Sequence, residues 1–399
     1  MLTPEQQLEA LIETAVRVET PEELLAKLRR GRPLRVKAGF DPSAPNIHLG
    51  HVVPLDVLRR FQDLGHQVVL IVGDFTARVG DPSGKLKTRP MLNEQELAAN
   101  ARTYFEQVGR IVDVERAEVR GNSEWLDTLD MVGVLRLTSS YTVARMLERD
   151  TFQERMELEE PITISELLYP LLQGYDSVAI NGDVEIGGTD QLFNLLVARD
   201  VQRFYGQEPQ VIMTFPLLVG LDGVEKMSSS LGNYVGITDD PNDMFGKLMS
   251  INDEMMLDYY RLLLRTPPPE VEWIKRRMAG GEAHPRDLKA AMARRVVARL
   301  HGESAAAAAQ QEFDRVFQER QLPSDLPEVQ VPAGSISLVQ LIRLADFAPS
   351  NSEARRLIQQ GAVSLNDERI TDPTATVAPA AGAVLRVGRR RFARVALRS

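Results

Sequence analysis

Hydrophobic positions in the first part of the chain fall into two alternating patterns. Continuous apolar runs at 34–40 (LRVKAGF) and 67–75 (QVVLIVGDF) predict buried strands, and the helical periodicity between them predicts a helix that ends at Gly65. Strand, helix and strand in this order indicate a parallel sheet. The alternation continues, with helices predicted over 93–109, 123–150 and 163–178 and strands near 110–119 and 210–220. We therefore expect an α/β fold with a Rossmann-like parallel sheet.

The pattern changes after Pro241, where long helical patterns without strand candidates predict a separate helical domain. The stretch 321–334 has three prolines and little periodicity, which is typical of an extended linker. After it, the chain predicts a helix capped by Gly361 and two β runs joined at Gly388. We expect an N-terminal helical arm (1–32), the α/β domain (33–235), a helical domain (236–320), the linker (321–334) and a small α+β domain (335–399).

Composition narrows the class of protein. With 399 residues, 43% of them hydrophobic, the chain is long enough for more than one buried core. No run of about 20 uncharged apolar residues occurs, and the N-terminus is polar and acidic, so we expect neither a membrane span nor a signal peptide. The absence of cysteine excludes disulfides, thiolate nucleophiles and cysteine-based zinc sites, and it favours a cytoplasmic protein.

Charge is distributed unevenly along the chain. The net charge is −9, yet residues 261–300 carry ten Lys or Arg against four Asp or Glu, and residues 350–399 carry nine Arg against four acids. Basic faces of this kind suit a phosphate backbone. The alternative is a basic face that is merely solvated.

Two histidines lie three residues apart just after the first predicted strand, in the sequence HLGH (48–51). Asn46 is a plausible helix N-cap, which would place His48 and His51 on one face of the first turns, where free N–H groups and the helix dipole favour phosphate. Both imidazoles can then donate hydrogen bonds to phosphate oxygens, while Gly50 leaves room for a nucleoside. A zinc site would need a third ligand, and none has the right spacing; two purely structural histidines are the other alternative.

A second polar motif is KMSSS (226–230), between Gly223 and Gly232. A lysine on such a loop can reach a pyrophosphate, and serine hydroxyls and successive N–H groups supply further donors. Because both motifs occur in an α/β domain, we interpret them as the two sides of one nucleotide site.

Together these motifs resemble the two signatures of class I aminoacyl-tRNA synthetases. The segments GDFTARVGDPSGK (73–85), LLYPLLQGYD (167–176) and EIGGTDQ (185–191) are similar to segments of the bacterial tyrosyl-tRNA synthetases, and EARRLIQQGAVSLNDERI (353–370) resembles their S4 RNA-binding module. The resemblance covers nearly the whole chain. It implies tyrosine–tRNA ligase activity through a tyrosyl-adenylate, with ATP as substrate, Mg²⁺ accompanying ATP and no tightly bound metal. It also implies tRNA as partner, no membrane, and a homodimer formed through an insertion at 115–165.

The resemblance assigns the site residue by residue. The tyrosine-binding residues are Lys37, Gly39, Asp41, Asp81, Tyr169, Gln173, Asp176 and Gln191. The ATP-binding residues are Asp41, Ser43, His48, Gly50, His51, Gly187, Asp190, Lys226 and Met227. The catalytic residues are His48, His51, Lys226, Ser229, Ser230 and Lys85, and the RNA-binding residues are Arg355, Arg356, Arg389, Arg390 and Arg391.

Spacing supports the tyrosine pocket independently. Tyr169, Gln173 and Asp176 recur at intervals of four and three on one helical face, and Pro170 is expected to interrupt that helix. An amphipathic core helix is the alternative. Within the implied pocket Asp176 accepts the phenolic hydrogen bond, so a substrate without the hydroxyl leaves that carboxylate buried and unpaired.

Three positions depart from the family pattern. Lys37 stands where many members have a tyrosine that contacts the phenol, Ser229 replaces the second signature lysine, and Glu185 stands where some members have glutamine. Two alternative functions therefore stay open: a related enzyme such as a tryptophanyl synthetase or a small-molecule nucleotidyltransferase, and an RNA-binding protein that has lost the chemistry.

Overall fold

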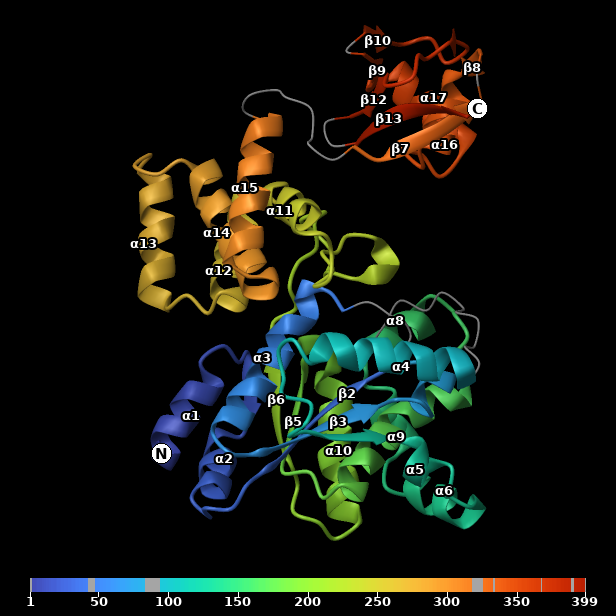
Figure 1. The fold of residues 1–399 in the computed structure, drawn as a ribbon. Helices are drawn as coiled ribbons and strands as arrows, with labels where there is room; N and C mark the ends of the chain where they lie inside the picture. Colours follow the sequence, from blue (N-terminus) through green and yellow to red (C-terminus); the bar gives the residue numbers. More distant parts are fainter. Residues whose placement is uncertain are drawn as a thin grey trace. The chain divides into compact units, whose positions relative to one another are not determined.

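The computed structural model describes residues 2–41, 47–82, 94–317, 326–332, 334–366, 368–388 and 391–398. The chain forms two compact units, residues 1–309 and 310–399. Figure 1 shows the ribbon of each unit.

The first unit is built on a six-stranded sheet in the order β1-β6-β5-β2-β3-β4. Its strands are β1 (Arg17–Glu19), β2 (Arg35–Phe40), β3 (Gln67–Val72), β4 (Glu118–Gly121), β5 (Val184–Gly188) and β6 (Val211–Phe215). All neighbouring pairs are parallel except β1, which pairs antiparallel with β6 at one edge. The predicted Rossmann-like parallel sheet is therefore confirmed.

The order of the strands indicates where in the sheet a ligand site is expected. From β2 the chain crosses to β3 on one side, whereas β5 pairs with β2 on the other side. The carboxyl ends of β2 and β5 thus form a topological switch point, where open α/β sheets leave a crevice for ligands. Asp41 directly follows β2, and Gly187 and Gly188 end β5.

Helices cover this sheet. Those before residue 241 are α1 (Pro4–Ile12), α2 (Pro21–Leu28), α3 (Leu49–Asp63), α4 (Glu94–Val108), α5 (Ser123–Leu126), α6 (Met131–Thr138), α7 (Val143–Met146), α8 (Asp150–Glu157), α9 (Ile164–Ala179) and α10 (Leu192–Phe204), with 3-10 turns η1 (Thr76–Arg78), η2 (Thr189–Gln191) and η3 (Ser229–Leu231). Helix α3 packs on β3 and β5, and α9 packs along α10. The apolar run of β3 is fully buried from Val68 to Ile71, as expected of a central parallel strand.

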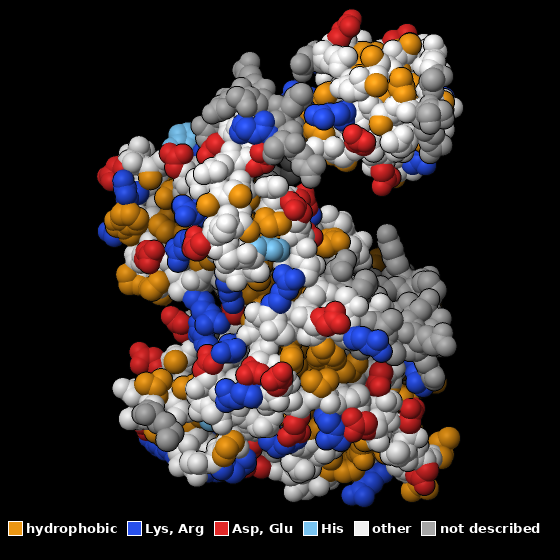
Figure 2. Space-filling model, in the orientation of Figure 1, with side chains coloured by type: hydrophobic (Ala, Val, Ile, Leu, Met, Phe, Trp, Pro, Cys, Tyr) orange, Lys and Arg blue, Asp and Glu red, His pale blue; other side chains and the backbone are white. Residues whose placement is uncertain are grey.

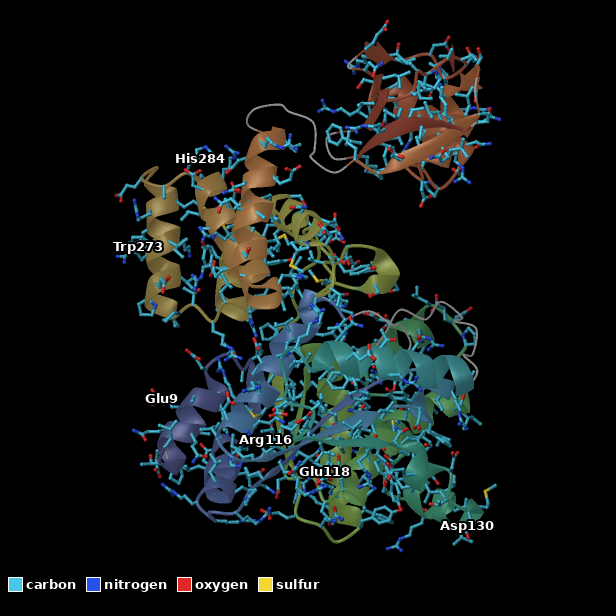
Figure 3. All side chains as sticks on the ribbon, viewed as in Figure 1. Glu9, Arg116, Glu118, Asp130, Trp273 and His284 are labelled. Carbon is cyan, nitrogen blue, oxygen red and sulfur yellow. The ribbon has the colours of Figure 1, made fainter. Side chains whose placement is uncertain are left out.

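Residues after Pro241 are helical, as predicted: α11 (Pro241–Met249), α12 (Asp253–Leu263), α13 (Pro268–Ala279), α14 (Pro285–His301) and α15 (Glu303–Phe317). The continuous pattern over 244–265 is broken into α11 and α12 because the Asn252 side chain accepts from the N–H of Met255 and starts a new helix. Trp273 lies on the outer side of α13 and is half exposed (Figure 3).

The second unit contains a five-stranded sheet in the order β10-β9-β12-β13-β7 and a two-stranded sheet of β11 and β8. Its elements are β7 (Glu328–Pro332), β8 (Ile336–Ser337), α16 (Leu338–Leu344), α17 (Asn351–Gln359), β9 (Val363–Leu365), β10 (Glu368–Ile370), β11 (Thr376–Val377), β12 (Val384–Val387) and β13 (Arg391–Arg398). The predicted helix before Gly361 and the two β runs around Gly388 are present. Strand β7 lies within the predicted linker range 321–334, because its alternating valines Val329 and Val331 are buried in the core of this unit.

Three local predictions need correction. The helix predicted over 123–150 is divided into α5, α6, α7 and the start of α8, because Asp130 and Thr142 each cap a new helix; Figure 3 labels Asp130 beside α6. Pro170 does not interrupt α9, which runs through it. The strand predicted near 110–119 begins only at Glu118, and the short strands β1 and β5 were missed.

No helix in the described part of the chain is long and apolar enough to cross a membrane.

Candidate active site

The two histidines lie at the start of α3. His48 itself is the N-cap, so the prediction of Asn46 as cap is wrong; Asn46 lies outside the described residues. The backbone N–H of His48 donates to Nδ1 of His51 at 3.2 Å, and the two ring centroids are 3.9 Å apart. Because Nδ1 of His51 accepts this bond, the proton of the neutral ring is on Nε2.

Both imidazoles are neutral near pH 7. Burial lowers the pKa of His48 to about 2, because the buried ring resists protonation beside His51 and the positive Lys226, and burial lowers the pKa of His51 to about 4. Nδ1 of His48 is buried without a hydrogen-bond partner among the described residues. Neutral rings of this kind interact with phosphate as N–H donors, not as cations.

The segment just after the KMSSS loop touches the start of α3. The N–H of Leu49 donates to the carbonyl of Val235 at 2.9 Å, and His48 forms a β-bridge with Gly236. A Cβ atom on Gly50 would lie 3.0 Å from the His48 ring and 3.6 Å from Cβ of Met227, which shows how closely glycine, ring and loop approach.

Lys226 is paired within the site. Its Nζ lies 2.5 Å from Oδ2 of Asp190, which belongs to the turn η2 after β5. Ser229 opens the turn η3, and Oγ of Ser230 lies 2.9 Å from Oγ of Ser228. The structure thus brings the signature lysine and the predicted ribose residue together.

Asp41 is held at the end of β2 by two hydroxyl groups. Oη of Tyr169 donates to Oδ2 of Asp41 at 2.8 Å, and Oγ1 of Thr76 donates to Oδ1 at 2.9 Å. A side chain at Gly73 would displace this carboxylate, because a Cβ there would lie 1.9 Å from Oδ1 of Asp41. At Gly39 a Cβ would meet nothing within 4 Å.

A chain of amides continues from Asp81. Nε2 of Gln191 donates to Oδ2 of Asp81 at 2.7 Å, and Nδ2 of Asn194 donates to the side-chain oxygens of both Gln191 and Gln173, each at 3.1 Å. Arg149 is buried, donates to Oδ1 of Asn194 at 3.0 Å and lies 3.6 Å from Asp81. At Gly187 an added Cβ would lie 3.0 Å from Cβ of Gln191.

Asp176 lies on α9, three residues after Gln173. Its carboxylate accepts from Nε1 of Trp125 at 2.8 Å and from Nδ2 of Asn122 at 3.4 Å, and it is almost fully buried. Burial raises the pKa of Asp176 to about 7, against the positive charge of Lys37 and the two hydrogen bonds. Lys37 lies 3.1 Å from Glu185 in an ion pair without solvent contact.

Not every predicted residue falls in this site. Ser43, Lys85, Arg389 and Arg390 lie outside the described residues. In the second unit Arg355 is exposed, Arg356 pairs with Glu353 at 2.7 Å, and Arg391 donates to the carbonyl of Phe347. The described residues contain no group of three or more His, Asp or Glu arranged for a metal ion.

Sequence reasoning missed four polar residues of the pocket. Asn122 and Trp125 directly follow β4, so their position at the carboxyl edge of the sheet was the signal that could have found them. Asn194 is one helical turn after Gln191 and shares its face. Arg149 precedes α8, and no pattern in the sequence marks it.

Comparison with known families and proteins gives consistent results along the whole chain. Residues 29–318 match the family model of tRNA synthetases class I (W and Y), and residues 318–395 match a tyrosine–tRNA ligase SYY-like C-terminal domain. A tyrosine–tRNA ligase of Moorella thermoacetica is 52% identical over 394 residues, covering 98% of this chain and 95% of the relative. One from Thermotoga maritima is 51% identical over 394 residues, covering 99% and 98%.

Solved structures agree on the fold. Tyrosyl-tRNA synthetase from Pyrococcus horikoshii, complexed with L-tyrosine, superposes with a TM-score of 0.64 at 21% identity and covers 79% of this chain and 97% of its own. The Archaeoglobus fulgidus enzyme with L-tyrosine gives a TM-score of 0.62 at 24% identity, covering 77% and 99%.

Proposed function

The chain belongs to the class I tRNA synthetases and, within them, to the tyrosine–tRNA ligases, and from that premise we propose which residues do the work. It activates L-tyrosine with ATP, releasing pyrophosphate, and transfers the tyrosyl group to the 3′-terminal adenosine of tRNA(Tyr). The observation that carries the assignment of the site is the contact of the start of α3 with Val235 and Gly236, just after the KMSSS loop, together with the pairing of Lys226 with Asp190.

In the first step the tyrosine carboxylate attacks the α-phosphorus of ATP. A carboxylate oxygen–phosphorus bond forms, and the bond from the α-phosphorus to the bridging oxygen breaks as pyrophosphate leaves. His48 and His51 donate hydrogen bonds to the phosphate oxygens as neutral rings, so they stabilise charge that develops in the transition state. No side chain forms a covalent bond, and positioning supplies the rest of the acceleration.

The ammonium of Lys226 supplies positive charge that stabilises the leaving pyrophosphate. This ammonium pairs with Asp190, the residue proposed to accept a ribose hydroxyl. When ATP binds, Lys226 is expected to contact a phosphate oxygen and Asp190 the ribose. Mg²⁺ enters with ATP and shares the charge of the leaving group. Lys85 and Ser43 are proposed to assist from segments outside the described residues.

Tyrosine is held at both ends. Asp81, Tyr169 and Gln173 surround the α-ammonium, with Asp41 and Gln191 supporting Tyr169 and Asp81. Asp176 accepts the phenolic hydrogen bond while Trp125 and Asn122 hold its carboxylate. A phenylalanine side chain would leave Asp176 buried and short of one donor, which is costly in a dry pocket.

The decisive experiment is amino-acid-dependent ATP–pyrophosphate exchange without tRNA, with tyrosine, phenylalanine and tryptophan supplied separately. Exchange with tyrosine alone is expected. Exchange with tryptophan would contradict the role of Asp176, and no exchange with any amino acid would favour the RNA-binding function without chemistry.

We also propose a homodimer formed through residues 115–165. Large apolar side chains on this part of the surface are 60–78% exposed, namely Met131, Val132, Leu135, Val143, Leu158 and Ile164. Hydrophobic side chains are visible around α6 at the lower right of Figure 2. An exposed apolar face of this kind is typical of a protein interface, and a second copy is the partner that a self-complementary face requires.

Charge substitutions test the dimer. Leu135→Glu is expected to shift the mass measured by sedimentation equilibrium from dimer to monomer. Val16→Glu, at a position equally exposed on the N-terminal arm, is the control and should leave the mass unchanged. A parent protein that sediments as a monomer would refute the proposed dimer.

We further propose how the other parts of the chain act. The helical domain (236–320) approaches the anticodon, and the domain 335–399 binds tRNA by phosphate contacts through Arg355, Arg356 and Arg389 to Arg391. The α/β domain (33–235) is the catalytic part. A protein that consumes ATP and charges tRNA is expected in the cytoplasm.

A further inference from the structure

Lys37 and Glu185 form a fully buried ion pair on adjacent strands. The two residues are register partners of β2 and β5, Nζ lies 3.1 Å from Oε1, and neither side chain exposes more than 1% of its surface. Burying two charges costs desolvation energy, and a well-packed apolar pair is often as stable. Stability alone therefore does not account for this pair.

The ammonium of Lys37 faces α9. Besides Glu185 it contacts the carbonyl oxygen of Gln173 at 2.9 Å and Oγ of Ser177 at 2.7 Å. These two residues are four apart, and Asp176 lies between them on the same helical turn. The positive charge thus lies against the turn of α9 that carries both Gln173 and Asp176.

The carboxylate of Glu185 fixes an amide. Nε2 of Gln173 donates to Oε1 of Glu185 at 3.0 Å, while Nε2 of Gln210 donates to the other oxygen. A carboxylate only accepts hydrogen bonds, so the NH₂ side of the Gln173 amide must face it. The amide oxygen of Gln173 consequently points to the other side, where it accepts from Asn194 at 3.1 Å.

We propose that the Lys37–Glu185 pair is the positioning element of the tyrosine pocket: Glu185 directs the amide oxygen of Gln173 toward the substrate ammonium, and Lys37 keeps Asp176 ionised as acceptor for the phenol. This inference rests on the proposed function and goes beyond it, because neither residue of the pair needs to touch the substrate. One buried pair thereby orients the groups that recognise both ends of tyrosine.

The charges around Asp176 support this division. Burial raises its pKa to about 7, the charge of Lys37 is the largest influence in the opposite direction, and the charge of Glu185 raises the pKa further. The charge of Asp176 also acts on Tyr169, whose pKa burial raises well above its ordinary value, so Tyr169 stays neutral. Lys37 and Glu185 therefore act on the ionisation of Asp176 in opposite directions.

The test is the pH profile of kcat/KM for tyrosine in ATP–pyrophosphate exchange, for Lys37→Met, Glu185→Gln and the double variant. Lys37→Met is expected to move the acid limb to higher pH, because Asp176 then ionises less readily. Glu185→Gln is expected to move it to lower pH. Glu185→Gln should also raise the KM for tyrosine by about tenfold, the effect of one hydrogen bond to a charged group, since a glutamine no longer dictates which side of the Gln173 amide faces it. The KM for ATP should not change.

Lys289→Met is the matched control. Lys289 is also buried, and it binds the carbonyl of Ile251 and Asp253, each at 2.7 Å, in the helical domain. Its removal should leave the tyrosine pH profile and KM at the parent values. An equal change in this control would overturn the inference by showing a general effect of losing a buried lysine.

The double variant keeps the test decisive if either single variant does not fold, because it leaves no unpaired charge behind. It is expected to fold, with a raised KM for tyrosine and an acid limb moved modestly to higher pH. A folded double variant with parental KM and pH profile would overturn the inference, as would single variants that shift the acid limb in the same direction. Failure of the parent protein to exchange with tyrosine would instead refute the proposed function.

Discussion

Asp176→Asn should stabilise the folded protein increasingly as the pH rises. The carboxyl has an ordinary pKa of 3.8, and burial raises it to about 7 in the folded chain. Between these values the folded state holds a proton that the unfolded state has lost, so stability falls as the pH rises from about 4 to about 7 and then stays level. At 1.36 kcal/mol per pKa unit, this shift lowers the free energy of unfolding by roughly 4 kcal/mol at about pH 8, where the folded carboxyl is ionised, and by roughly 2 kcal/mol at about pH 5.5, where it is still protonated.

Asparagine keeps an oxygen for Nε1 of Trp125 and has no charge to desolvate. The stability advantage of Asp176→Asn over the parent should therefore be about 2 kcal/mol larger at pH 8 than at pH 5.5. The chain has two tryptophans, so a Trp273→Phe background leaves Trp125, which contacts Asp176, as the only tryptophan reporter of urea unfolding. Other titrating groups cancel in the comparison between variants. An advantage that does not change with pH would refute the assignment of a buried, high-pKa carboxyl.

Three further predictions concern the reaction, the packing and the RNA. Lys226→Ala is expected to slow adenylate formation by about 10²- to 10³-fold in single-turnover measurements while tRNA binding is retained; a parallel loss of tRNA binding would contradict the division of roles. Gly174→Ala places a Cβ 2.9 Å from a side-chain atom and 3.1 Å from a Cα atom of α10, so it should lower the free energy of unfolding by about 1–3 kcal/mol. Gly246→Ala is the control: its Cβ would have nothing within 4 Å, and the free energy of unfolding should not fall. Replacing Arg355 and Arg356 by alanine should weaken tRNA binding. A plot of the logarithm of the binding constant against the logarithm of the salt concentration should become less steep, by about one for each phosphate that is no longer neutralised. An unchanged slope would show that neither arginine contacts the tRNA.

The hydrophobic pattern predicted the α/β architecture because a parallel sheet buries its strands on both faces. The run Gln67–Val72 is recognisable for that reason, whereas β5 ends in two glycines and β1 has three residues with one edge partner. Such short strands form through pairing with neighbouring strands, and their own sequences contain little that predicts a strand. The prediction of a linker over 321–334 was wrong for the same reason, since β7 becomes a strand only through its parallel pairing with β13.

The site was predictable where one helix or one turn collects the residues. Tyr169, Gln173 and Asp176 share a face of α9, so their spacing alone indicated a common cleft. Trp125 lies in the short helix α5 and Arg149 just before α8, and the placement of both depends on tertiary packing, about which sequence spacing carries no information. The resemblance to the family proposed the substrate contacts, but it did not indicate that Lys37 would pair with Glu185.

The two ends of the proposed site differ in charge, and each suits the substrate proposed to bind there. Around the proposed amino-acid site carboxylates predominate over cations, with Asp41, Asp81, Asp176 and Glu185 against Lys37 and Arg149. A pocket with excess negative charge favours the ammonium of tyrosine and disfavours a second polyphosphate. At the proposed nucleotide end burial keeps both histidines neutral, and Lys226 is paired with Asp190. The neutral histidine rings can still donate N–H groups, whereas the proposed role of Asp176 at the amino-acid end depends on the nearby charge of Lys37.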